Sequence, residues 1–232
     1  MTAAGGEQLA FDLAFRPAMG REDFMVGASN QAAVALLDAY PAWSPQVAVI
    51  VGPHGSGKTH LGEVWRARSD AVRVEAATLG EAGVAAIIQA RNGLIEDIPA
   101  HGRVPDETSL FHVLNAALQG RVFLLLTSRV PPASWPVATP DIVTRLRLVP
   151  VCRIEPPDDG LFAAVILKLL ADRQLTIAAN AVRYAVPRIE RSFAAAARFV
   201  DMVERIALER RRPATLGVVR EVVKALGDSD LT

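Results

Sequence analysis

Short apolar runs alternate with amphipathic segments along the first two thirds of the chain. The runs over residues 47–51 and 122–127 are almost purely apolar, which is typical of strands buried on both faces of a parallel sheet. Between them lie segments such as 108–119, where Leu110, Leu114 and Leu118 recur at the spacing of one helix face. This alternation predicts an α/β fold with a parallel sheet covered on both faces. We expect strands at 47–51, 71–74, 94–98, 122–127 and 149–154, and helices at 29–39, 60–68, 81–89, 108–119 and 142–146.

The pattern changes after the dipeptide Pro156-Pro157. Asp158 can cap a helix whose apolar positions, among them Leu161 and Val165, follow at helical spacing. Further helices are expected at 178–186, 192–211 and 215–226, and this part of the sequence shows no strand pattern. The sequence therefore predicts three parts: a flexible tail at 1–20, an α/β core at 21–156 and a small all-α domain at 157–232.

Composition limits the classes of protein to consider. The chain has 232 residues, of which 51% are hydrophobic, enough for one large or two small domains with a substantial core. The 25 basic residues balance the 25 acidic ones, and without a basic block strong direct binding to DNA is not expected. A single cysteine suits a reducing cytoplasm. The sequence shows no signal peptide and no apolar run long enough for a membrane span.

Residues 52–59 match the pattern G-x-x-x-x-G-K-[ST] and lie between an expected strand and an expected helix. Glycines in such a loop let its backbone N–H groups point at phosphate oxygens, and the following helix adds the positive end of its dipole. The lysine of the pattern reaches the β- and γ-phosphates, and the hydroxyl of the last residue is a ligand for Mg²⁺. We therefore predict a nucleotide-phosphate site at Gly52, Pro53, His54, Gly55, Ser56, Gly57, Lys58 and Thr59.

Several further stretches resemble the AAA+ ATPases, and more closely the ATPase domain of the bacterial replication initiator DnaA. They are the entry segment 23–30, the Walker B strand 94–98, the sensor 1 segment 127–132, the arginine-finger segment 144–146 and the hinge 154–158. The resemblance covers about residues 22–226. It implies a P-loop AAA+ core with a parallel sheet, followed by a small all-α lid.

The resemblance also implies roles for single residues. Thr59 and Glu96 would hold Mg²⁺, Asp97 would polarise the attacking water, and Arg145 would be an arginine finger that acts on a neighbouring subunit. ADP or ATP would be the bound nucleotide. Its adenine side would be formed by Phe24, Met25, Val26 and Asn30, and His60 is a further candidate for nucleotide binding.

The N-terminal tail resembles the peptide by which many bacterial proteins dock on the polymerase sliding clamp. Gln8, Leu9, Phe11 and Leu13 carry the pattern, and the apolar members would enter a hydrophobic cleft. The sequence shows neither the N-terminal interaction domain nor the C-terminal helix-turn-helix domain of DnaA, so we expect a bare ATPase module. A clamp peptide joined to such a module resembles the Hda family. That resemblance implies negative regulation of replication initiation, with DnaA and the sliding clamp as partners. Assembly of this chain into a homo-oligomer stays open.

Three positions depart from the family pattern. Glu96 stands where the first Walker B acid is normally Asp, Arg129 or Ser128 stands at sensor 1, and Ala195 falls in the register of the sensor 2 arginine. Loss of that arginine removes a cation from the γ-phosphate, so we expect nucleotide binding with weak or no intrinsic hydrolysis. Two alternatives stay open: a nucleotide-sensing adaptor without a catalytic role, and a self-standing P-loop ATPase or kinase.

Overall fold

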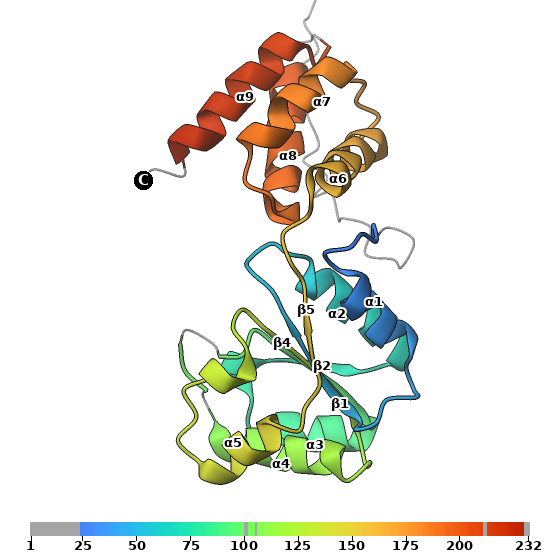
Figure 1. Cartoon of the computed structure of the whole chain (residues 1–232), viewed down its shortest axis with the longest axis vertical. Coiled ribbons are helices and arrows are strands. Elements are labelled where there is room, and N and C mark those ends of the chain that lie inside the picture. The colour runs from blue at the N-terminus through green and yellow to red at the C-terminus, as the bar shows by residue number, and fades with distance from the viewer. Residues whose placement is uncertain (1–23, 100–101, 105, 211–212, 230–232) are drawn as a thin grey trace, which may run out of the picture.

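A five-stranded parallel sheet forms the centre of the larger part of the molecule (Figure 1). The computed structural model describes residues 24–99, 102–104, 106–210 and 213–229. The strands are β1 (Val47–Val51), β2 (Val72–Glu75), β3 (Asn92–Glu96), β4 (Phe123–Ser128) and β5 (Val151–Arg153), in the order β2-β3-β4-β1-β5. Every neighbouring pair is parallel, so the carboxyl ends of all five strands lie at one edge of the sheet.

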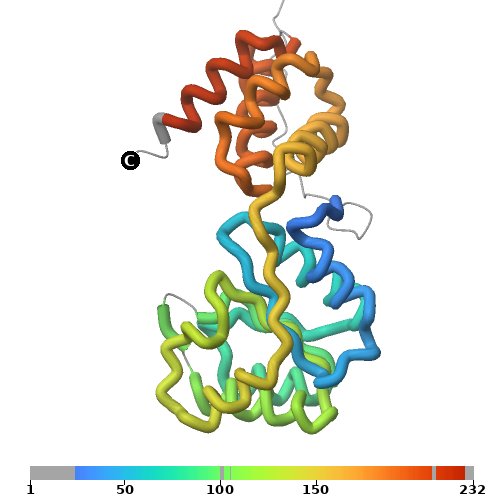
Figure 2. Tube along the Cα trace, in the orientation of Figure 1, coloured from blue at the N-terminus to red at the C-terminus, as the bar shows by residue number. Residues whose placement is uncertain are grey.

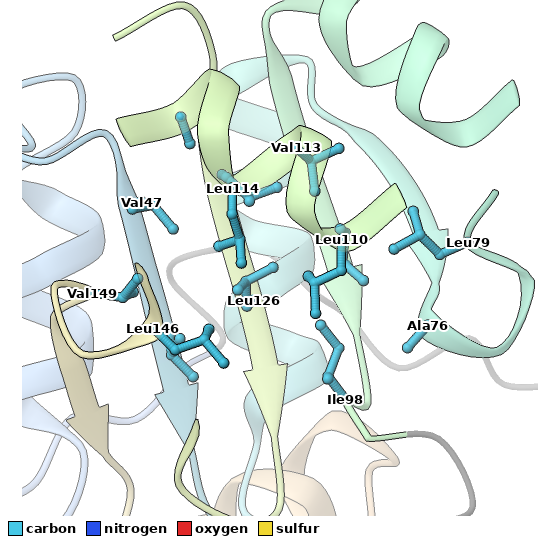
Figure 3. Close-up of a cluster of buried hydrophobic side chains, with 14 of the residues drawn as sticks. Val47, Ala76, Leu79, Ile98, Leu110, Val113, Leu114, Leu126, Leu146 and Val149 are labelled. Carbon is cyan, nitrogen blue, oxygen red and sulfur yellow. The ribbon is translucent and has the colours of Figure 1, made fainter. Parts of the chain in front are cut away.

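Helices cover both faces of this sheet. On one face lie α1 (Gln31–Asp38) and α2 (Lys58–Ser69), and on the other lie α3 (Glu81–Ala90), α4 (Glu107–Leu118) and α5 (Pro140–Leu146) (Figure 1). Successive strand residues point to opposite faces, so Leu94 and Leu125 pack with α1 and α2, whereas Ile95 and Leu126 pack with α3, α4 and α5. Figure 3 shows Leu126 of β4 in the cluster with Leu110 and Leu114 of α4. β1 and β4 are buried on both faces, which is why these two strands read as continuous apolar runs.

Within the described residues, four helices form the smaller part of the molecule, here called the lid. They are α6 (Asp159–Asp172), α7 (Ala179–Ala185), α8 (Phe193–Arg210) and α9 (Leu216–Ser229), and they enclose a separate apolar cluster. Asp158 caps α6, because its carboxylate accepts a hydrogen bond of 2.7 Å from the Leu161 N–H. A single segment of the chain, running from β5 into α6, connects the sheet to the lid in this view (Figure 2). Short 3₁₀ turns lie at Ala76–Thr78, Pro132–Ser134 and Val186–Arg188.

The predicted fold class, a parallel sheet with flanking helices followed by helices alone, is confirmed. The expected strand 94–98 was misplaced: β3 begins at Asn92 and ends at Glu96. Asp97 has a φ of 60°, which turns the chain out of the strand, and the Ile98 N–H then donates to the carbonyl of Thr127 at 2.9 Å. None of the described helices is both long and apolar enough to cross a membrane.

The lid core should contribute a large share of the stability of the chain. Phe199 of α8 is fully buried, whereas Leu208 of the same helix is 70% exposed. We predict that Phe199→Ala lowers the free energy of unfolding by about 3–5 kcal/mol, and that Leu208→Ala changes it by less than about 0.5 kcal/mol. Urea denaturation followed by circular dichroism measures both values. Equal losses in the two variants would contradict the assignment of α8 to a packed lid.

Candidate functional site

The loop between β1 and α2 has the geometry of a phosphate cradle. Gly55 and Gly57 have φ values of +68° and +93°, a region that residues with a Cβ rarely adopt, and Gly57 caps the N-terminus of α2. Lys58 is only 9% exposed, and its Nζ donates to the carbonyls of Gly52 and Pro53 at 2.8 Å each. Backbone N–H groups, a helix N-terminus and a buried ammonium group therefore meet in one short segment.

A cavity of about 410 Å³ opens beside this loop, at the carboxyl edge of the sheet. Parallel pairing places Glu75 of β2 opposite Glu96 of β3, and Val51 opposite Ser128, so the residues that follow these strands converge. This is the edge at which open α/β sheets bind their ligands. The cavity is lined by His54, Gly55, Ser56, Gly57, Lys58, Thr59, Arg73, Glu75, Glu96, Asp97, Thr127, Arg129, Phe193 and Ala194.

Burial changes the pKa of two charged groups in the cavity. Desolvation lowers the pKa of the Lys58 ammonium, with Arg129 acting in the same direction and Asp97 and Glu96 opposing it. Desolvation also raises the pKa of Glu96, and the Arg73 charge and the Thr59 hydroxyl partly oppose that shift. A bound phosphate would stabilise the charged form of Lys58, so an anionic ligand is the natural partner of this loop.

Each acid predicted for the catalytic edge is paired with an arginine. The Nε of Arg73 lies 2.6 Å from Glu96 Oε2, close enough for an ion pair although not aligned as a hydrogen bond. Arg129 holds Asp97 with both ends of its guanidinium group, Nε to Oδ1 at 3.1 Å and Nη2 to Oδ2 at 3.2 Å. The Asp97 N–H also donates to Thr127 Oγ1 at 3.1 Å, so both the backbone and the side chain of Asp97 are bonded to residues at the end of β4.

This pairing bears on whether the residues suit Mg²⁺. Thr59 and Glu96 line the same cavity, as the sequence predicts. Mg²⁺ prefers oxygen ligands with uncompensated negative charge, but Glu96 already faces Arg73 and Asp97 already faces Arg129. Across the described ranges, no group of three or more His, Cys, Asp and Glu side chains could hold a metal ion. The donor set therefore does not fit a Mg²⁺ site that is charged by these carboxylates.

The lid reaches the cavity through the first turn of α8. The Phe193 N–H donates to the carbonyl of Gly55 at 2.8 Å, and a Cβ built on Gly55 would lie 2.7 Å from the Cβ of Ala194. The expectation that Ala195 takes the sensor 2 position is wrong by one residue, because Ala194 lines the cavity and Ala195 is buried in the lid core. One residue rotates a helix position by about 100°, which moves it to another face.

No protein-family model matches the chain. The chain is 24% identical to the replication initiator DnaA of Cutibacterium acnes, in an alignment that covers 88% of this chain and 46% of that protein. The chain thus spans about half the length of the curated relative that it matches. Domain III of DnaA from Thermotoga maritima superposes with a TM-score of 0.74 at 18% identity, covering 91% of this chain and 98% of that structure. This is a DnaA-like AAA+ fold.

Other solved structures extend the likeness. A DnaA bound to AMPPCP and single-stranded DNA superposes with a TM-score of 0.71 at 18% identity, over 84% of this chain and 68% of that one. A RuvB variant from Thermotoga maritima gives a TM-score of 0.69 at 14% identity, over 90% and 72% of the two chains. The fold is therefore shared with solved structures that are only 14–18% identical in sequence.

The residues expected on the adenine side lie next to the cavity without lining it. Phe24 is buried, with its ring centroid 5.2 Å from that of His60 and 6.2 Å from that of Phe193. Met25 packs partly against the lid core, and Val26 is 46% exposed. Asn30 is fully buried, where its side chain accepts from the Gly27 N–H and donates to the Met25 carbonyl, both at 2.9 Å. Asn30 thus holds the entry segment in place, a structural role in the DnaA-like fold.

Arg145 lies on α5, and its side chain contacts residues of α4 and α5 in the same chain. Its Nε donates to Asn115 Oδ1 at 3.0 Å, one Nη donates to the Asp141 carbonyl at 3.2 Å, and its guanidinium carbon lies 4.5 Å from the centroid of the Phe111 ring. Arg147, two residues on, is exposed. The predicted clamp peptide lies outside the described residues, as do Gln8, Leu9, Phe11 and Leu13.

No site role was expected from the sequence for four residues that line the cavity, Arg73, Glu75, Phe193 and Ala194. Arg73 and Glu75 are two residues apart on β2 and therefore lie on the same face of it. They reach the site only because β2 lies beside β3. Phe193 and Ala194 come from the lid, and Thr127, in the expected sensor 1 segment, lies one residue before the end of β4. The only local signal in the sequence was that Arg73 and Glu75, two residues apart, lie near the end of an expected strand. Parallel sheets bind their ligands at the carboxyl ends of their strands.

The contact between the lid and the loop can be tested at a single glycine. Gly55→Ala places a Cβ 2.7 Å from Ala194, whereas at Gly120, with a similar φ of +70°, the nearest atoms to a new Cβ are 3.9 Å away. Both variants incur the backbone cost of a positive φ, so their difference isolates the clash. We predict that Gly55→Ala loses about 1–3 kcal/mol more unfolding free energy than Gly120→Ala in urea titrations. Equal losses would show that the lid does not rest on the loop.

Proposed function

We propose that this chain binds an adenine nucleotide, ADP or ATP, with its phosphates in the 52–59 loop. The observation that carries the proposal is the position of Lys58, whose ammonium group is buried inside a glycine loop and turned toward two of its carbonyls. Burial of this charge costs free energy that a phosphate group would return through charge-assisted hydrogen bonds. A DnaA-like neighbour that was solved with AMPPCP supports an adenine nucleotide as the ligand.

The adenine base would lie on the side of the loop where the lid and the entry segment meet. Phe24 packs on His60 and Phe193 there, and these rings provide apolar surface next to the phosphate loop. The entry segment is fixed by Asn30, which bonds to both Met25 and Gly27. In this arrangement the base would rest between core and lid, so binding would join the two parts of the chain.

We further propose that the protein acts in the control of DNA replication initiation, by promoting hydrolysis of ATP bound to DnaA. The sequence similarity to DnaA and the DnaA-like fold support this role. The site itself is poorly equipped to hydrolyse ATP, because Asp97 is held by Arg129 and the described part of the lid contributes only Phe193 and Ala194 to the cavity. Contact with the sliding clamp through Gln8, Leu9, Phe11 and Leu13 would bring the protein to replicated DNA.

Arg145 is the residue proposed to act in trans. An arginine offers a planar, permanently charged fork that can stabilise the charge on a transferring phosphoryl group. To reach a neighbouring subunit, its side chain has to leave Asn115 and the Phe111 ring, contacts that now orient it along α5. The same contacts favour a second candidate function, a nucleotide-sensing adaptor in which Arg145 stays in place and has no catalytic role.

Loss of the loop lysine tests nucleotide binding. Lys58→Ala should weaken ADP binding by at least about tenfold, since a hydrogen bond to a charged group contributes about 1.5–3 kcal/mol. Lys224→Ala, which removes an exposed lysine from α9, is the matched control and should bind as the unmodified protein does. Isothermal titration of nucleotide-free protein with ADP measures both. Unchanged affinity in Lys58→Ala would remove the phosphate site from this loop.

Substitution of Arg145 separates the two candidate functions. In a mixture of DnaA, ATP and DNA-loaded clamp, Arg145→Ala should abolish the stimulated conversion of DnaA-bound ATP to ADP while ADP binding by the variant stays intact. Arg145→Lys should restore little, because an ammonium group lacks the planar fork. Arg121→Ala, at an exposed arginine outside the α5 segment, should stimulate fully. Full stimulation by Arg145→Ala would favour the adaptor, and stimulation by a chain that lacks residues 1–14 would exclude the clamp peptide.

A further inference from the structure

The cavity beside the phosphate loop carries its own counter-charges. Its charged lining consists of three cations, Lys58, Arg73 and Arg129, and three acids. The acids are Glu75, Glu96 and Asp97, and each of the three is in contact with a guanidinium group. P-loop sites commonly use acids at the ends of these strands to attract a divalent cation, which then neutralises the phosphates. Here the chain supplies the positive charge itself.

Arg73 is the counter-ion of the buried acid. Glu96 is 3% exposed, so its carboxylate is poorly stabilised by water, and the guanidinium group 2.6 Å away compensates part of its charge. Arg73 is also held by Glu75 at 2.6 Å and by Glu63 at 3.4 Å. Three carboxylates therefore fix this group of β2, and an arginine does not lose its charge at any physiological pH.

Arg129 takes the corresponding place at the end of β4. Its bidentate contact with Asp97 uses Nε and one terminal nitrogen, and Asp97 is in turn fixed through its N–H to Thr127. Arg129 is exposed on the cavity side, so its remaining N–H groups are accessible to a ligand. Planar guanidinium groups bind phosphate oxygens through paired hydrogen bonds, which makes Arg129 suited to an anion held by the loop.

A divalent cation would find this arrangement unfavourable. It would approach two fixed guanidinium groups of like charge, and it would have to displace Arg73 from Glu96 before that carboxylate could order its water shell. We propose that Arg73 and Arg129 replace the divalent cation, so that the pocket binds nucleoside diphosphates without Mg²⁺. The inference rests on the proposed nucleotide binding and specifies which groups neutralise the phosphate charge.

The test compares ADP binding with and without the metal. Full-length protein that has been stripped of nucleotide is titrated calorimetrically with ADP, once in excess MgCl₂ and once in EDTA. The two dissociation constants should agree within about threefold, whereas a tenfold loss in EDTA, about 1.4 kcal/mol, would overturn the inference and leave nucleotide binding intact. Absence of binding in both buffers would instead reject the proposed function itself, and the inference with it.

Variants assign the effect to the arginines. Arg129→Ala frees the Asp97 carboxylate, so ADP binding in EDTA should fall by at least about tenfold and should recover in part when MgCl₂ is added. Arg66→Ala is the control, since it removes an arginine that pairs with Glu63 at 2.7 Å and does not line the cavity. It should bind ADP equally in both buffers. An Arg129→Ala variant that keeps full affinity in EDTA would show that Arg129 does not replace the divalent cation. If a variant does not fold, the comparison of ADP affinity in MgCl₂ and in EDTA for the unmodified protein still tests the inference.

Discussion

Parallel pairing of β1, β3 and β4 is the constraint on which the site depends. Because β1 pairs with β4 and β4 with β3 in fixed register, the loop after Val51, the acids at 96–97 and Arg129 emerge side by side. A shift of one residue in any of these pairs would turn the whole strand over and move its apolar set to the wrong face. Burial on both faces of the sheet therefore fixes the geometry of the cavity.

Much of this arrangement is predictable from the sequence, because its signals are local. The glycine loop before Lys58 follows from residue types alone, and the buried strands follow from their apolar runs. The confirmed cap at Asp158 is likewise a local signal. The pairing of Arg73 with Glu96 is different in kind. Twenty-three positions separate the two residues in the sequence, and they meet only because β2 adds to the sheet next to β3.

Two further features could not be read from the sequence, and each has a physical reason. The residue of α8 that faces the loop is Ala194, because the phase of that helix is set by its packing in the lid core and by the bond between the Phe193 N–H and Gly55. The buried side chain of Asn30 is used to hold its own segment, since unpaired amide groups in the interior are costly. Tertiary packing decided both positions.

The paired acids connect the structure to its proposed role. Under the proposal, a site that neutralises phosphate charge with arginines, and holds Asp97 in an ion pair, would retain a nucleotide and not hydrolyse it. Such a chain would use the nucleotide to hold lid and core together, and would present α5 with Arg145 to a partner. This division of labour agrees with a regulator that acts on hydrolysis at another protein's site.

A crystal structure of the protein grown with ADP and MnCl₂ tests the central claim most directly, because manganese is located by its anomalous scattering. The account predicts ADP phosphates in the 52–59 loop, intact contacts from Arg73 to Glu96 and from Arg129 to Asp97, and no anomalous peak beside Thr59. A manganese peak between Thr59 and the phosphates, with Arg73 displaced from Glu96, would contradict it.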